Sequence, residues 1–249
     1  MLKEERHQLI LNEARLHNKV LLSDLSDMLE VSVDTVRRDV KELDYQKKLK
    51  KVHGGAISLG FNIYNYKEQD IYSHKKKARI AAKAVELIPN GSVVLIGGGT
   101  TNLEIARILP NKLHATFFTP SLPVAMQLLS HPQIEVVFVG GKLLKDSQIA
   151  AGAQTINSLG EIRADICFLT ANSIDLHNGI TDIDWDIVQM KKAMIKASKK
   201  VISPVISEKL ASTQRYRICK VNDIDVLITE LNPSSSILDA YRNEDIRLL

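Results

Sequence analysis

The feature that most constrains the fold of this chain is an alternation, from residue 80 onward, of helical segments with short apolar runs. The runs are SVVLIG (92–97), HATFFT (114–119), IEVVFVGG (134–141), DICFLT (165–170), VISPVI (201–206) and DIDVLIT (223–229). Strands that alternate with helices imply crossover connections, and therefore a mostly parallel sheet covered on both faces. We expect one α/β domain over residues 80–249.

The first 57 residues have a different pattern, in which apolar residues recur at helical spacing in three short segments. A first helix would bury Leu9, Ile10 and Ala14. Ser23 is expected to cap a second helix, with Leu22, Leu25, Met28 and Leu29 facing inward. Ser32 is expected to cap a third, with Val33, Val36, Val40 and Leu43 within one arc. The short EVS link predicts a helix-turn-helix whose third helix is the recognition helix.

The outward face of the recognition helix carries polar side chains suited to DNA. Thr35, Arg38 and Lys41 point away from the apolar arc, and Arg37 flanks them. Residues 37–51 hold seven basic and three acidic side chains, whereas residues 1–36 hold four basic and seven acidic ones. Alternating apolar residues around Gly54 and Gly55 predict a β-hairpin, or wing, whose lysines contact phosphates. This local concentration of positive charge is typical of polyanion binding.

Residues 58–79 lack sustained periodicity and are interpreted as a linker between residues 1–57 and the α/β domain. A basic run lies near its end, at Lys75, Lys76, Lys77 and Arg79. We interpret this run as the solvated start of a helix and assign it no site.

The stretch VVLIGGGTTNLEIARIL (93–109) joins a strand, a bare loop and a helix. Its central residues are Gly97, Gly98, Gly99, Thr100, Thr101 and Asn102. Glycines leave backbone amides accessible, and a helix N-terminus carries about half a positive charge, so the stretch predicts a phosphate site. The alternative is a glycine turn required only by tight packing. A dinucleotide fingerprint would need glycine at position 102 and a P-loop would need Gly-Lys-Ser/Thr, so neither fits.

Two more loops are expected at the same edge of the sheet. Gly140, Gly141 and Lys142 follow the third strand, and Ser121 follows the second. Open α/β sheets bind ligands outside the carboxyl ends of their strands. Gly141 and Lys142 are therefore candidate effector contacts, and Ser121 is either a helix cap or a ligand contact.

The N-terminal motif resembles the winged helix-turn-helix of the DeoR family of bacterial transcription regulators. The similarity lies in Ser32, the run TVRRDV (35–40), Leu49 and VHGGA (52–56). It implies operator contacts from Ser32, Thr35, Arg37, Arg38, Lys41, Lys50, Lys51 and His53. Asp39 is instead expected to pair with neighbouring charges. Lys47 or Lys48 stands where the family usually has a turn glycine, and a lysine replaces the arginine usual before HGGA.

The rest of the chain resembles the effector-sensing domain of the same family. The shared segments are GTT (99–101), GGK (140–142), ADICFLTANSID (164–175) and KKAM (191–194). The resemblance implies a fold like that of sugar-phosphate isomerases, which binds a phosphorylated sugar or related metabolite without turnover. Gly97 stands where the family commonly has aspartate and Pro120 where it has asparagine. VISPVISEK replaces an aspartate-serine-serine-lysine stretch, of which Lys209 remains as an effector contact.

These features predict a DNA-binding transcriptional repressor of carbohydrate metabolism genes, controlled by a phosphorylated sugar. Because operators are two-fold symmetric, a homo-oligomer is expected. The alternative is a sugar-phosphate isomerase or deaminase-like enzyme. The Asp-Gly-Ala-Asp segment known from ribose-5-phosphate isomerases is missing, so we predict no enzyme and no catalytic residue.

Composition and motifs exclude several other classes. Cys167 and Cys219 lie far apart without a CxxC, and no HExxH occurs, so neither a disulfide framework nor a metal site is predicted. No cofactor is expected. No eighteen apolar residues run together, and the first ten residues contain acids but no apolar signal segment. We therefore expect a cytoplasmic protein without a membrane partner.

Overall fold

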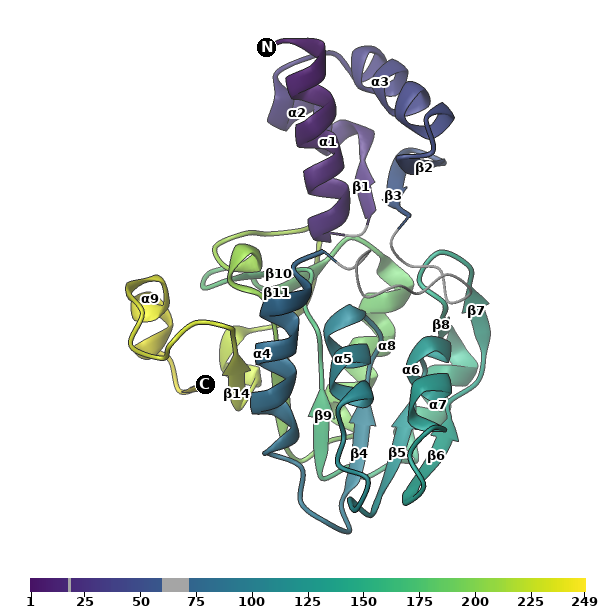
Figure 1. Cartoon of the computed structure of the whole chain (residues 1–249), viewed down its shortest axis with the longest axis vertical. Helices are drawn as coiled ribbons and strands as arrows, with labels where there is room; N and C mark the ends of the chain where they lie inside the picture. Colours follow the sequence, from purple (N-terminus) through teal and green to yellow (C-terminus); the bar gives the residue numbers. More distant parts are fainter. Residues whose placement is uncertain (18, 60–71) are drawn as a thin grey trace. The chain divides into compact units, whose positions relative to one another are not determined.

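The computed structural model describes residues 1–17, 19–59 and 72–249, and its contacts divide the chain into two compact units, Met1–Tyr72 and Ser73–Leu249 (Figure 1). Residues 60–71 of the predicted linker lie outside the described residues. Residues 74–79 of that linker begin helix α4 (His74–Val85) in the second unit. The basic run at 75–79 therefore lies within a helix.

The first unit packs three helices against a small antiparallel sheet. Its elements are α1 (Lys3–His17), β1 (Lys19–Leu21), α2 (Leu22–Leu29), α3 (Val33–Tyr45), β2 (Leu49–Val52) and β3 (Gly55–Ser58). Strand β3 pairs with both β1 and β2, which gives the sheet order β1-β3-β2. One apolar cluster holds these elements together, with Ile10, Leu25, Val36, Leu43 and Leu49 buried. The predicted winged helix-turn-helix is confirmed, with β2 and β3 as the wing.

Four details predicted for these helices are wrong. Leu9, Met28 and Val33 are exposed rather than inward, and α1 buries the predicted Ile10 and Ala14 together with Leu11 and His17. Ser23 lies inside the first turn of α2 and does not cap it, because the helix already begins at Leu22. The wing supplies an acceptor for one backbone amide at the start of α2, since the Leu22 amide donates a hydrogen bond of 2.9 Å to Gly54 O.

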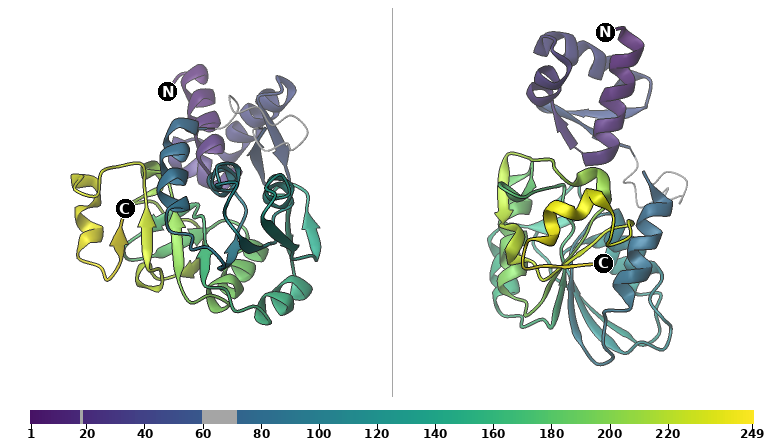
Figure 2. Two further views of the ribbon diagram at one scale, coloured as in Figure 1. Left: turned by 60° about the horizontal axis from the view of Figure 1, so that its bottom comes forward. Right: turned by 90° about the vertical axis from the view of Figure 1, so that its left-hand side faces the viewer.

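The second unit is built on a seven-stranded parallel sheet of order β15-β14-β12-β9-β4-β5-β6 (Figure 2). All six predicted runs form strands of this sheet, which confirms the parallel α/β class. They are β4 (Val93–Ile96), β5 (Ala115–Thr119), β6 (Ile134–Phe138), β9 (Ile166–Phe168), β12 (Val201–Pro204) and β14 (Val226–Ile228). The seventh strand, β15 (Arg247–Leu248), was not predicted.

Helices cover the two faces of this sheet unequally. On one face α4, α5 (Thr100–Arg107) and α6 (Leu122–Leu128) lie side by side (Figure 1). The other face is covered by α8 (Trp185–Lys196), whose Val188 and Met194 share a buried cluster with Leu95 and Cys167. The short α7 (Ala153–Gly160) packs on α8, and its Thr155 Oγ1 donates to Gly140 O just after β6 at 2.9 Å.

Several small elements extend the carboxyl edge of the sheet, and the sequence pattern did not reveal them. The hairpin β7 (Lys142–Leu144) and β8 (Ile149–Ala151) follows β6. After β9 come β10 (Ser173–Asp175) and β11 (Gly179–Asp182), which join β13 (Tyr216–Cys219) in an antiparallel sheet. The remaining elements are the 3-10 turns η3 (Ser207–Lys209), η4 (Val221–Asp223) and η5 (Ser236–Leu238), and helix α9 (Asp239–Arg242).

Candidate functional site

The recognition helix α3 has a well-defined beginning and end. Ser32 is its N-cap, and the Thr35 amide donates to Ser32 Oγ at 3.2 Å, as predicted. At the other end the Lys47 amide donates to Asp44 O and the Lys48 amide to Leu43 O, both at 2.9 Å. These two bonds form a Schellman motif, in which Lys47 takes the left-handed conformation, with φ +54°. Lys47 therefore occupies the turn position where the family usually has glycine.

Asp39 fixes the recognition helix to α1. Its carboxylate is buried and accepts hydrogen bonds from Arg6 Nε at 2.5 Å and Arg6 Nη2 at 3.1 Å, with His7 Nε2 also 3.1 Å away. Burial alone would raise the pKa of Asp39, but the bonds from Arg6 and His7 outweigh it and hold that pKa below its ordinary value. The expectation that Asp39 pairs with protein charges is confirmed.

The eight residues predicted to contact DNA lie on α3, its cap and the wing, and all except the half-buried Thr35 are exposed. Ser32 and Thr35 share a hydroxyl hydrogen bond of 2.9 Å. Arg37 pairs with the exposed Asp34 one turn back, so its guanidinium is already partly engaged. Arg38 and Lys41 are exposed on the same helix, on the side away from its buried residues.

The wing turn depends on two glycines. Gly54 has φ +71°, a conformation that other residues seldom adopt. A Cβ at Gly55 would lie 2.2 Å from Val20 O on the neighbouring strand, so no side chain fits there. The turn leaves His53, Lys50 and Lys51 exposed on the wing, and the Lys51 amide is tied to Asp44 Oδ1 at 2.9 Å.

In the second unit the three glycines form a tight loop between β4 and α5. A Cβ at Gly98 would lie 2.5 Å from Ile149 Cδ1 and 3.3 Å from Ser121 Oγ. Gly99 is the N-cap of α5 with φ +103°, and a Cβ there would lie 3.1 Å from Thr170 Oγ1. The structure thus brings Ser121 and Thr170 to the predicted glycine loop.

Asn102 holds this loop from inside. It is fully buried, and its Nδ2 donates to Gly97 O at 3.0 Å and to Phe168 O at 3.1 Å. Thr170 Oγ1 donates to Gly98 O at 2.8 Å. Two buried oxygens beside the loop, Asn102 Oδ1 and Ser121 Oγ, have no hydrogen-bond partner in the described part of the chain. Buried polar atoms are rarely left unsatisfied, so these two mark a place where a ligand could bind.

A chain of hydrogen bonds near the loop connects the half-buried Lys209 to the buried Lys191. Lys209 Nζ donates to Ala171 O at 3.0 Å and lies 3.5 Å from Asn172 Oδ1. Asn172 Nδ2 donates to Asp182 Oδ1 at 2.9 Å, and Lys191 Nζ donates to Asp182 Oδ2 at 2.7 Å. Burial would raise the pKa of Asp182, but Lys191 and two backbone amides hold it below its ordinary value.

A third lysine adds to this positive charge. Lys77 on α4 is only 6% exposed, so the expectation of a solvated basic run is wrong at this position. Burial lowers the pKa of Lys77 to about 8, while Glu208 and Glu104 oppose that shift. Burial, with repulsion from Lys77 and Lys191, lowers the pKa of Lys209 to about 7. These ammonium groups lie in surroundings that favour a bound anion.

The remaining predicted effector residues are Gly141, Lys142, Thr100 and Thr101. Gly141 has φ +149°, and a Cβ there would lie 2.1 Å from Thr155 Oγ1, so its glycine serves backbone packing. Lys142 is exposed on β7, and no hydrogen bond or ion pair joins it to the glycine loop among the described residues. Thr100 is half-buried and Thr101 buried in the first turn of α5.

Sequence reasoning missed Lys77, Asn172, Asp182 and Lys191 as members of this site. The sequence has a dense set of acids, Asp175, Asp182, Asp184 and Asp186, and favours caps and surface charge over a metal site for them. Asp184 does cap α8 by accepting from the amides of Asp186 and Ile187, whereas Asp182 is buried. The available signal was that Lys191 lies on the same helical face as Val188 and Met194 of α8; Asp182 is the last residue of the buried strand β11, which the sequence pattern did not indicate.

Two other kinds of site are not seen in the part of the chain that the structure describes. No group of three or more His, Cys, Asp or Glu side chains there could hold a metal ion. No helix among the described residues combines the length and apolar character needed to cross a membrane.

Comparison with known proteins gives matches in both units. The model of a DeoR-like helix-turn-helix domain matches residues 6–60, and the DeoR C terminal sensor domain matches residues 72–231. An HTH-type transcriptional regulator of Bacillus subtilis is 32% identical, over 94% of this chain and 92% of the relative. The glycerol-3-phosphate regulon repressor of Escherichia coli is 27% identical, over 100% of this chain and 99% of the relative. Among solved structures, ribose 5-phosphate isomerase A of Methanocaldococcus jannaschii superposes with a TM-score of 0.40 and 20% identity, covering 56% of this chain and 55% of the isomerase.

Proposed function

Because this chain belongs to the DeoR family of transcriptional regulators, we propose that it is a repressor that leaves its operator when a phosphorylated sugar occupies the second unit. The protein is a DNA-binding regulator and not an enzyme. The relatives that it matches over nearly their full length are likewise a transcriptional regulator and a repressor. Its proposed targets are genes of carbohydrate metabolism, and its proposed place of action is the cytoplasm.

The observation that supports a phosphorylated effector best is the combination of a bare loop with buried ammonium groups. The Gly97 amide already donates to Phe168 O at 3.1 Å, so the loop offers the backbone amides of Gly98 and Gly99 at the N-terminus of α5, beside the unpartnered Ser121 Oγ. Lys209 donates to Ala171 O, next to Thr170, which donates to Gly98 O, so Lys209 can supply positive charge near this loop. A phosphate dianion would satisfy the amides, the hydroxyl and the ammonium groups together.

For DNA we propose that Arg38 and Lys41 read or approach base edges from α3 while Lys50, Lys51 and His53 contact the backbone from the wing. A helix of this kind reads one half-site, so two copies are needed on a two-fold operator. We therefore propose that the functional form is a homo-oligomer. The exposed positions of these side chains support the assignment.

The effector site is tested with Gly98→Val, which places a branched side chain where the ligand phosphate would approach. Gly160→Val is the matched control, because a Cβ at Gly160 meets no atom within 4 Å. Calorimetric titration would use glycerol 3-phosphate, hexose 6-phosphates and inorganic phosphate. We expect Gly98→Val to abolish binding of the phosphorylated ligand and to keep DNA binding, with the control unchanged. Undiminished ligand affinity in Gly98→Val would move the phosphate site elsewhere.

A sensor is distinguished from an enzyme by thermodynamic linkage between effector binding and operator binding. If the effector weakens operator binding by some factor, the operator must weaken effector binding by the same factor. Such couplings are typically about 1–3 kcal/mol. The measurement is a titration of effector with and without operator, alongside an assay for isomerised product. Equal affinities in both titrations would argue against the sensor.

A further inference from the structure

The face of the sheet that carries α8 is incompletely covered toward strand β6, where the end of α7 and the segment after it lie over the strands. Parallel register aligns Leu95, Phe118 and Val137 in one row across β4, β5 and β6. Leu95 is fully buried under the α8 layer, whereas Phe118 and Val137 are only partly buried. The neighbouring row carries Thr116 hydrogen-bonded to Glu135, with Val93 beside them on β4, so on β5 and β6 the apolar area lies toward the carboxyl ends of the strands.

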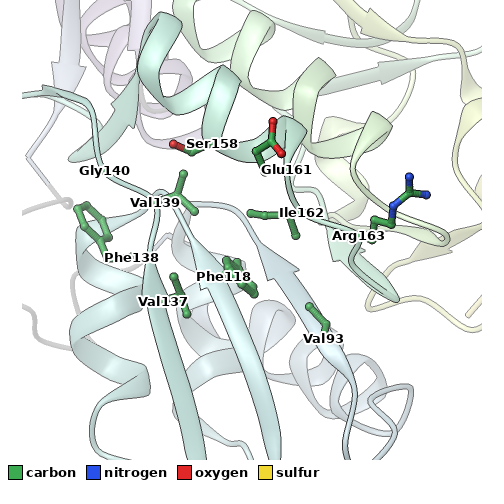
Figure 3. A pocket seen from close by; sticks show the side chains of 10 residues that line it. All are labelled: Val93, Phe118, Val137, Phe138, Val139, Gly140, Ser158, Glu161, Ile162 and Arg163. Atoms are coloured by element: carbon green, nitrogen blue, oxygen red, sulfur yellow. The ribbon is translucent and has the colours of Figure 1, made fainter.

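This incompletely covered area forms a groove of about 510 Å³ (Figure 3). Its floor is made by Val93, Phe118, Val137 and Val139, and Ile162 lines it from the segment after α7. Phe138, which is 42% exposed, lies at the outer end on β6. Because β6 is the last strand of the sheet, its outer backbone edge is also open to a partner.

The rim of the groove carries two opposite charges on either side of one apolar residue. Glu161 and Arg163 flank Ile162, and both are exposed. Neither forms an ion pair within the described part of the chain. In a two-fold symmetric contact, residue i meets residue j and residue j meets residue i. A two-fold axis at Ile162 would therefore place each glutamate opposite an arginine without any change of sequence.

We propose that this groove is the surface through which two copies of this chain associate, with a two-fold axis passing close to Ile162. Glu161 then pairs with Arg163 of the partner subunit, and the apolar floor is covered by the same surface of the second copy. The self-complementary charge order favours a second copy over an unrelated protein, which would need to match both charges independently. The need for two copies rests on the proposed operator binding, whereas the location of the contact rests on the groove itself.

The test is sedimentation equilibrium of the full chain without DNA, so that it does not depend on the operator. Glu161→Arg and Arg163→Glu each bring like charges together twice in a symmetric contact. Each should weaken association at least about tenfold, which is 1.4 kcal/mol. The double variant Glu161→Arg/Arg163→Glu restores opposite charges and should recover wild-type association. Glu86→Arg makes the same charge change on α4, which covers the opposite face, and should have no effect.

A second measurement uses the axis itself, because a residue on a two-fold axis lies next to its own copy. Ile162→Cys should form a covalent dimer on mild oxidation, whereas Glu86→Cys should not. The natural Cys167 and Cys219 are buried and should not interfere. A monomeric wild-type protein, single charge variants with wild-type association, or a double variant that stays as weak as the singles would each overturn the proposal. Circular dichroism of every variant verifies that it is folded.

Discussion

Replacing Asp39 by asparagine should destabilise the first unit far more than its conservative appearance indicates. The Asp39 carboxylate is buried and accepts two hydrogen bonds from Arg6, with His7 also in range. Charge-assisted bonds contribute about 1.5–3 kcal/mol each, and leaving one partner of a buried pair uncompensated costs about 3–5 kcal/mol. Asparagine keeps one acceptor oxygen, so we expect a loss of about 3 kcal/mol. A unit of this size is rarely more stable than about 3–5 kcal/mol, so the change should bring it close to unfolding.

The assay exploits the single tryptophan of the chain, Trp185, which lies in the second unit. In urea, circular dichroism reports both units, whereas tryptophan fluorescence reports only the second. Asp39→Asn should shift part of the circular dichroism transition to lower urea and leave the fluorescence transition in place. The control is Asp34→Asn on the same helix, whose pair with Arg37 is exposed and contributes about 0–1 kcal/mol.

The ion pair between Asp39 and Arg6 also predicts how the stability of the first unit depends on pH. Because the folded pKa of Asp39 lies below its usual 3.8, its stabilising effect is present above that value and is lost as pH falls through the folded pKa. Asp39→Asn should lack this acid-dependent loss. Equal, small shifts for Asp39→Asn and Asp34→Asn would refute the reasoning, since burial would then make no difference.

Three further predictions concern the recognition helix, its end and the effector site. Arg38→Ala should weaken operator binding by about 1–3 kcal/mol and reduce the ratio of operator affinity to random-DNA affinity in a competition assay. Lys50→Ala should weaken binding to operator and to random DNA equally. Lys47→Gly should raise the free energy of unfolding of the first unit by about 0.5–1 kcal/mol, measured from a higher urea midpoint, because glycine adopts the left-handed conformation without strain, and Lys47→Ala should not. The folded pKa of Lys209, about 7, lies below its usual 10.5, so the protonated form is disfavoured and the unliganded second unit should gain stability between about pH 7 and 10.5. Fluorescence-detected unfolding of Lys209→Met should show a smaller gain over that range.

The parallel sheet was predictable because its central strands β4, β9, β12 and β14 are buried on both faces. Runs such as VVLI and ICF contain almost no polar residue, and a helix or turn signal separates each from the next. The short strands β7, β10 and β13 mix polar and apolar residues over three or four positions, which is too short for a period to be recognised. Their existence depends on pairing with distant segments rather than on local pattern.

The candidate effector site likewise contains some features that depend on local sequence and others that depend on tertiary packing. The glycine loop was visible because bare backbone between a strand and a helix is a local property. The burial of Lys77 was not visible, since a lysine within a basic run has the same local sequence whether it faces solvent or a core. Asn102 was expected to touch the effector, and the structure adds a role in bracing the loop through Gly97 and Phe168.

The desolvated lysines also shape how this protein can respond to selection. Replacing a buried charged group by a well-packed apolar one is often neutral or stabilising, so methionine or leucine should keep or raise heat resistance at the buried Lys77 and the half-buried Lys209, both of which have lowered pKa values. Under the proposed function those same replacements would remove the groups that attract the effector. A laboratory selection for thermostability alone would therefore enrich variants that hold their operator and no longer answer to the metabolite. Alternating that selection with one for induction should keep both lysines in place.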